Sequence, residues 1–458
     1  MSKEILLEKL KDVPEILETS IKMLEANQPV KIYEGEFVIR ESSKEITVSG
    51  YIQFDWFPST GANFYGTIKD LSNDNIALIK NTDYVDVIVN DFNIGSGLIT
   101  STTYSNNISI IGAFRLETIT GDKSIAVEKI KFCIPNFQEF IGETVKKITS
   151  SNIQTARNRI TLENERYVII IDKCIDNVAR YKALNEKGGY IITHVGELIP
   201  KNGNLTFQNV NDINHCLSTF LSYVNGKRTS VMFIEGMYKE EVIWCDYSNY
   251  HIDTYDFLPS WTYKSEINGL NEIWQEFSKM WSKNEDKDVI ITAIHWYLEC
   301  NKNSGFVDGS IIMAQTALEL LYNWFIVENK KLLIGKDSEN INAANKIRLL
   351  ISQLEITYEV PEKFTSLNEY LKSEKLVDAP EVVVQIRNAI VHSQVEKRKK
   401  LKDIDDLAKH QALQLCIWYI ELALLKVLNY NSKYSNRCSS KDTISGKVEL
   451  VPWNNFKI

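Results

Sequence analysis

The sequence of 458 residues contains no closely spaced pair of cysteines. Its seven cysteines are never nearer to one another than 22 positions, which excludes a CxxC metal ribbon and a dense disulfide framework. No apolar run approaches the roughly 20 residues that cross a bilayer, and the N-terminus lacks the uninterrupted apolar stretch of a signal peptide. These absences predict a cytoplasmic protein with buried thiols and with no membrane segment, metal or other cofactor.

The chain also lacks an excess of positive charge. Lys and Arg number 52 against 60 Asp and Glu, so the formal net charge is -8, which argues against a protein that coats nucleic acid. The excess of acidic residues lies in the first part of the chain. Residues 1–280 carry 28 basic and 37 acidic side chains, whereas residues 281–458 carry 24 basic and 23 acidic ones. The second part of the chain can therefore still hold a local basic site.

The chain divides into two regions with different patterns of apolar residues. From about residue 30, short β-branched and aromatic segments such as ITVSGYI (46–52) and YVIIID (167–172) alternate with Gly, Asn, Asp and Ser turns, which is typical of antiparallel strands. After about residue 265, apolar residues recur with a period near 3.6, which is typical of helices. The sequence predicts an α+β fold, in which an all-helical bundle follows a β-rich region.

Four segments follow from these patterns. They are an N-terminal helical segment interrupted near Pro14 (1–29), a β-rich region of one or two subdomains (30–265), a helical domain (266–431), and a polar tail that is loosely ordered or docked elsewhere (432–458). Within the β-rich region, residues 211–224 are expected to form a helix. In the helical domain, Asp378 followed by Pro380 is typical of a helix start.

The segment with the most chemistry is QIRNAIVH at 385–392. On a helix, Asn388 and His392 are i and i+4 and share a face, and Arg387 lies at the flank of that face. An Arg and a His that converge on one cleft can cleave RNA without a metal, because guanidinium stabilises the phosphorane-like transition state and His moves the proton. Arg387 and His392 are therefore candidate catalytic residues, and Asn388 could support them by orienting His392 or by contacting phosphate.

A structural interpretation of the same residues is open at this point. Arg387 would then pair with a carboxylate such as Glu381 or Glu396, and His392 would end its helix against a carbonyl. Against this, the chain contains no other Arg that is followed by a His with four to six residues between them. The basic run at 397–402 could hold RNA phosphates, or it could be a solvated helix end.

Other polar residues are weaker candidates. His194 and Glu197 have i,i+3 spacing, but they follow a predicted strand, so metal ligation is a minor alternative. Glu299 and Glu319 lie on the early helices of the helical domain and could face its cleft, or each could be a helix-surface acid or a buried paired acid.

The residues RNAIVH at 387–392 resemble the Rx4-6H motif of the HEPN superfamily, whose common form has Asn, Asp or His directly after the Arg. A β-rich region before a C-terminal HEPN domain resembles the ApeA-like group of bacterial anti-phage proteins. The resemblance implies a metal-independent endoribonuclease that acts as a toxin in abortive infection and whose two motifs meet across a homodimer or higher homo-oligomer. It also implies an RNA substrate, RNA ends with a 2′,3′-cyclic phosphate, a phage-derived activator and a regulatory N-terminal region. The alternative is a non-catalytic HEPN-type scaffold that dimerises or binds nucleotide or RNA.

Overall fold

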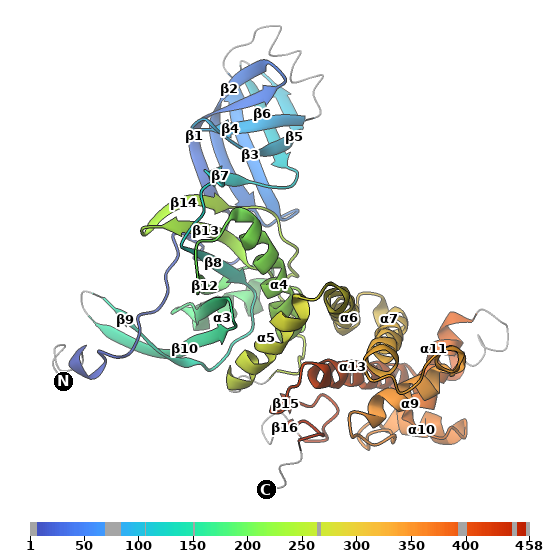
Figure 1. Ribbon diagram of the computed structural model, residues 1–458. Coiled ribbons are helices and arrows are strands. Elements are labelled where there is room, and N and C mark those ends of the chain that lie inside the picture. The colour runs from blue at the N-terminus through green and yellow to red at the C-terminus, as the bar shows by residue number, and fades with distance from the viewer. Residues whose placement is uncertain are drawn as a thin grey trace. The chain divides into compact units, whose positions relative to one another are not determined.

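The computed structural model describes residues 7–68, 84–105, 107–149, 152–262, 267–392, 401–441 and 447–454. The chain divides into two compact units, one made of Met1–Ser218 with Thr229–Asp256 and the other of Thr219–Arg228 with Phe257–Ile458. The first unit contains a β barrel and a sheet, and the second is mostly helical (Figure 1). The predicted α+β fold, with the β-rich part first, is confirmed.

Six antiparallel strands near the start of the first unit form a closed barrel. They are β1 (Val30–Glu41), β2 (Lys44–Asp55), β3 (Gly61–Ile68), β4 (Tyr84–Val89), β5 (Phe92–Tyr104) and β6 (Ile108–Phe114), in the order β1-β2-β3-β6-β5-β4, with β4 paired to β1. Alternate side chains point inward, and Ile39, Val48 and Phe64 are fully buried there. Gly112 lies where a Cβ would come within 1.9 Å of the Phe64 ring, so this position has no room for a larger residue.

An antiparallel sheet of eight strands forms the rest of the β structure in this unit. Its order is β7-β14-β13-β8-β12-β11-β10-β9. The strands are β7 (Ile119–Gly121), β8 (Lys129–Pro135), β9 (Glu143–Ile148), β10 (Ile153–Glu163), β11 (Tyr167–Lys173), β12 (Ile192–Pro200), β13 (Met232–Tyr238) and β14 (Glu241–Asp246). The helices in this part of the chain are α3 (Asn177–Lys187) and α4 (Phe207–Asn225), and the residues of α4 from Thr219 onward belong to the second unit. Helix α4 confirms the helix expected at 211–224.

The N-terminal segment differs from the prediction. Residues 7–9 are helical and residues 10–29 are not, so the prediction of a helical segment over 1–29 is wrong for 10–29, and residues 1–6 lie outside the described residues. The Ile16 N–H donates to the Lys146 carbonyl and the Lys146 N–H donates to the Pro14 carbonyl, both at 2.9 Å. The segment pairs in parallel with β9, the edge strand of the sheet. An edge strand offers unpaired backbone groups, and pairing with them replaces the hydrogen bonds of a helix.

The second unit contains most of the helices. They are α5 (Ile267–Trp281), α6 (Asn284–Asn301), α7 (Phe306–Leu321), which continues as the π-helix η1 (Tyr322–Asn329), α8 (Lys336–Asn340), α9 (Ala343–Ser352), α10 (Thr365–Ser373), α11 (Ala379–Val391) and α13 (Asp406–Val427). Helix α13 is buried along most of its length, and α6, α7, α10 and α11 pack against it. It is the central helix of the unit.

The α7–η1 stretch is the most apolar long helix of the described chain. By length and composition alone, Phe306–Asn329 could cross a membrane. However, 61% of its most apolar stretch of 18 residues is buried inside the protein, where α7 packs against α6 and α13. Such burial is typical of the core helix of a helical unit.

The described part of the C-terminal tail docks on the helical unit. β15 (Lys433–Ser435) and β16 (Val448–Leu450) pair as a short antiparallel hairpin. Between them, the buried Arg437 guanidinium donates to both carboxylate oxygens of Glu421, at 2.9 and 2.5 Å. Glu421 is fully buried on α13, and the Tyr297 hydroxyl on α6 also donates to it, at 2.9 Å. The tail thus supplies the cation that neutralises a buried carboxylate.

Candidate functional site

Helix α11 positions the predicted catalytic residues, and its start is held firmly. The Asp378 carboxylate accepts a hydrogen bond from the Glu381 N–H at 3.0 Å, and Pro380 lies in the first turn, as the sequence predicts. Arg348 on α9 donates to both oxygens of the same carboxylate, at 2.6 and 2.8 Å. The cap and the bidentate ion pair together fix the start of α11 against α9.

The three predicted site residues lie at the other end of α11. The half-buried Arg387 guanidinium donates to the side-chain oxygen of Asn388 at 3.3 Å. The backbone carbonyl of Asn388 accepts a hydrogen bond from the His392 N–H at 3.1 Å. His392 ends the helix in an extended conformation, with φ -87° and ψ 114°, and its side chain is exposed. The Asn388 side chain therefore positions Arg387, and the helix end presents the imidazole to solvent.

Two carboxylates, Glu381 and Glu396, were possible ion-pair partners of Arg387, and the one that the structure describes, Glu381, does not pair with it. Glu381 instead accepts a hydrogen bond from the Val377 N–H at 2.8 Å. Within the described ranges of the chain, no ion pair of Arg387 is found. Glu396 and the basic residues 397–400 lie outside the described residues.

Arg387 also lines a cavity of about 110 Å³ between α7, α9 and α11. The other lining residues are Gln315, Thr316, Leu318 and Glu319 from α7, and Ala343, Lys346 and Ile347 from α9. The Lys346 ammonium lies 2.5 Å from the Glu319 carboxylate. Glu319 thus lines this cavity as an exposed, paired carboxylate, and Glu299 forms an ion pair with Arg228 and does not line it. Sequence reasoning missed Lys346, because no motif joins it to Arg387.

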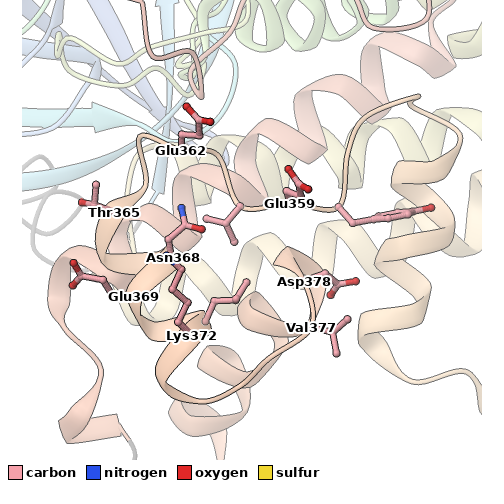
Figure 2. Close-up of a pocket in the computed structure, with 11 residues that line it drawn as sticks. Glu359, Glu362, Thr365, Asn368, Glu369, Lys372, Val377 and Asp378 are labelled. Carbon is pink, nitrogen blue, oxygen red and sulfur yellow. The ribbon is translucent and has the colours of Figure 1, made fainter.

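A second cavity, of about 740 Å³, lies beside α10 (Figure 2). Its charged lining residues are Glu359, Glu362, Glu369, Asp378 and Lys372, so carboxylates outnumber cations there by four to one. Carboxylates repel phosphate, and Asp378 is already engaged by Arg348 and by the start of α11. The acidic cavity is therefore unsuited to a phosphate group.

The metal candidates His194 and Glu197 do not form a site together. Both lie in β12, where residues three apart point to opposite faces of the sheet. His194 is buried with its Nδ1 atom 3.0 Å from the Thr193 hydroxyl, and Glu197 lies 3.4 Å from the Lys129 ammonium. Among the described residues, no group of three or more His, Cys, Asp or Glu side chains could hold a metal ion.

Because His194 is buried, the first unit should become less stable at acid pH. Burial, and then the charge of Lys173, lower the pKa of His194 to about 3, against about 6.5 in the unfolded chain. Between these values the unfolded chain binds the proton and the folded one does not, so stability falls as pH drops from about 6.5 towards 3, by roughly 3 to 5 kcal/mol in all. The opening free energy of β12 peptides, from hydrogen exchange of the full chain at pH 4 to 8, measures this for the wild type and for His194→Leu. The variant should lose that part of the pH dependence, and identical slopes would contradict the assignment.

Comparisons with known proteins match two parts of the chain. Residues 122–258, which hold all of the eight-stranded sheet except β7, match the family model of the YopA central domain. Residues 283–449, from α6 into β16, match that of the YopA C-terminal domain, and they include Arg387 and His392. The chain is similar to the SPbeta prophage-derived uncharacterized protein YopA of Bacillus subtilis (strain 168), with 27% identity over 446 residues, which is 95% of this chain and 98% of that protein. No solved structure matches.

Proposed function

We propose that this protein is a metal-independent endoribonuclease of the HEPN type, with Arg387 and His392 as its catalytic residues and Asn388 in support. The observation that carries the proposal is the end of α11, where Asn388 positions the Arg387 guanidinium and the imidazole of His392 is exposed. In the acidic cavity beside α10, four carboxylates surround the one lining cation, Lys372, so that cavity is less favourable for a phosphate.

The chemistry assigns one role to each side chain. The 2′-oxygen of RNA attacks the adjacent phosphorus, and the 5′-oxygen leaves with a proton, so the product has a 2′,3′-cyclic phosphate. Arg387 stabilises the negative charge that develops on the phosphoryl oxygens. His392 moves a proton, because imidazole takes up and releases protons near neutral pH. One His cannot be base and acid in the same step, so the proposal includes a homodimer in which two copies of the motif meet.

The biological role proposed is a toxin in defence against phage. The relative from Bacillus subtilis is named as prophage-derived, and an RNase carried by a resident prophage can stop a competing phage by stopping the host cell. In this proposal the protein acts in the cytoplasm, the first unit restrains the helical unit, and a phage product releases the restraint.

The test measures RNA cleavage by the purified protein in EDTA and RNA integrity in phage-challenged cells, which supply any phage activator. The wild type should cut RNA and leave cyclic phosphate ends, and Arg387→Ala and His392→Ala should not. His410→Ala is the matched control, because His410 is an exposed His of the same unit on α13. Equal digestion by all four proteins would show that the activity comes from elsewhere.

A second function, a non-catalytic HEPN-type scaffold, is favoured by the position of His392 at the end of its helix, which is a structural role. In that case His392→Asn, which keeps a polar helix end but cannot act as an acid or base, should leave the cellular phenotype intact.

A further inference from the structure

The small cavity beside Arg387 is also lined by charged side chains that have no role in the proposed reaction. Two of its lining residues are cations from different helices, Arg387 on α11 and Lys346 on α9. One lining residue is a carboxylate, Glu319 on α7, which is paired with Lys346. Two cations against one carboxylate give this lining a net positive charge.

The two partners of that ion pair are buried to different degrees. The Lys346 side chain is 15% exposed, whereas that of Glu319 is 57% exposed. The Lys346 ammonium also lies 5.6 Å from the centre of the Tyr322 ring, a cation–π contact that helps to hold it in place. An ion pair with a largely exposed carboxylate adds little stability, so another anion can replace Glu319 at small cost.

The size of the cavity restricts what can enter. Pockets for whole small molecules have volumes of about 300 to 1,000 Å³, whereas this cavity has about 110 Å³, so a nucleoside does not fit. With about 30 Å³ for each water molecule, the space equals a few waters, which is enough for one tetrahedral oxyanion. Guanidinium and ammonium groups are the donors that proteins use for phosphate oxygens.

We infer that this cavity binds a backbone phosphate of RNA beside the cleaved linkage, with Lys346 as its phosphate-binding residue. In the free protein Glu319 holds the Lys346 ammonium, and the RNA phosphate displaces that carboxylate. The inference rests on the proposed RNA substrate and adds to it a residue that gives affinity without sequence preference.

The experiment uses the full chain and a fluorescein-labelled 2′-O-methyl RNA ten-mer, which lacks the free 2′-hydroxyl that cleavage needs. By fluorescence anisotropy, Lys346→Met should weaken binding about tenfold, the factor that one charge-assisted hydrogen bond contributes. The slope of log affinity against log salt should become shallower by about 0.7. Lys346→Arg should keep most of the affinity, and Glu319→Gln should bind more tightly, because the anion that competes for Lys346 is gone.

The matched control is Lys409→Met. The Lys409 side chain is 12% exposed and ion-paired, as Lys346 is, but it does not line the cavity, so the control should bind as the wild type does. Unchanged binding by Lys346→Met, or no binding by the wild type, would overturn the inference. If binding depends on Lys346 but RNA stays intact in phage-challenged cells, the nuclease proposal fails and the phosphate site stands. If RNA is cut through Arg387 and His392 while Lys346→Met binds normally, the inference alone fails.

Discussion

His392→Ala should lower the rate of RNA cleavage by about 100- to 10,000-fold, the range that a positioned general acid or base contributes. Arg387→Ala should lower it by about 100- to 1,000-fold, because one stabilising donor at the developing oxyanion is lost. Arg387→Lys should fall between Arg387→Ala and the wild type, since ammonium keeps the charge but loses the forked donors and the bond to Asn388. Single-turnover cleavage of a labelled RNA by wild type and variants measures all three effects.

A heterodimer of the wild type with His392→Ala tests whether the site is shared between copies. If His392 of both chains serves one site, as base and as acid, the heterodimer has only one of the two and should keep about 1% of the wild-type rate or less. Unfolding and refolding the wild type and the variant together gives these heterodimers, which mass spectrometry identifies. A heterodimer that keeps half of the wild-type rate would show that each chain cuts RNA with its own residues. A monomer in an active preparation would contradict the dimer itself.

The elements whose structure depends on residues close together in the sequence could be predicted from the sequence. The 3.6-residue period after residue 265 indicates helices because each helix buries one face. It failed for residues 10–29, where apolar spacing suits a helix but the backbone at Glu15 pairs with the edge strand β9 instead. That outcome depends on a strand more than 100 residues further along the chain, which the segment itself does not encode.

The residues of the candidate site could likewise be predicted only where they lie close together in the sequence. Arg387, Asn388 and His392 could be found from sequence because they share one helix and their spacing is local. Lys346 could not, because it reaches the same cavity from α9, more than 30 residues earlier. Nor could Arg437, which lies in a polar segment expected to be loose or docked elsewhere, whereas its side chain is 4% exposed beside Glu421.

Arg437→Met should destabilise the helical unit by about 3 to 5 kcal/mol, the cost of leaving one partner of a buried ion pair uncompensated. Glu421 is fully buried on α13 and accepts two hydrogen bonds from Arg437 and one from Tyr297. Without Arg437 only the hydroxyl remains among these donors, and one neutral donor cannot neutralise a buried carboxylate. Because a chain of two units need not unfold in one step, hydrogen exchange of α13 peptides in the full chain is the measurement, and their opening free energy should fall by this amount.

Two further variants separate the ion pair from general damage. Lys283→Met removes an exposed ion pair with Asp286 at 3.8 Å, where the expected change is below about 1 kcal/mol. The double variant Arg437→Met with Glu421→Leu removes both charges and should be more stable than Arg437→Met alone, since no uncompensated carboxylate is left. If the double variant is less stable than the single one, packing of the tail rather than charge would dominate. Recovery in the double variant would mean that the buried carboxylate at Glu421 makes folding of the helical unit depend on its C-terminal tail.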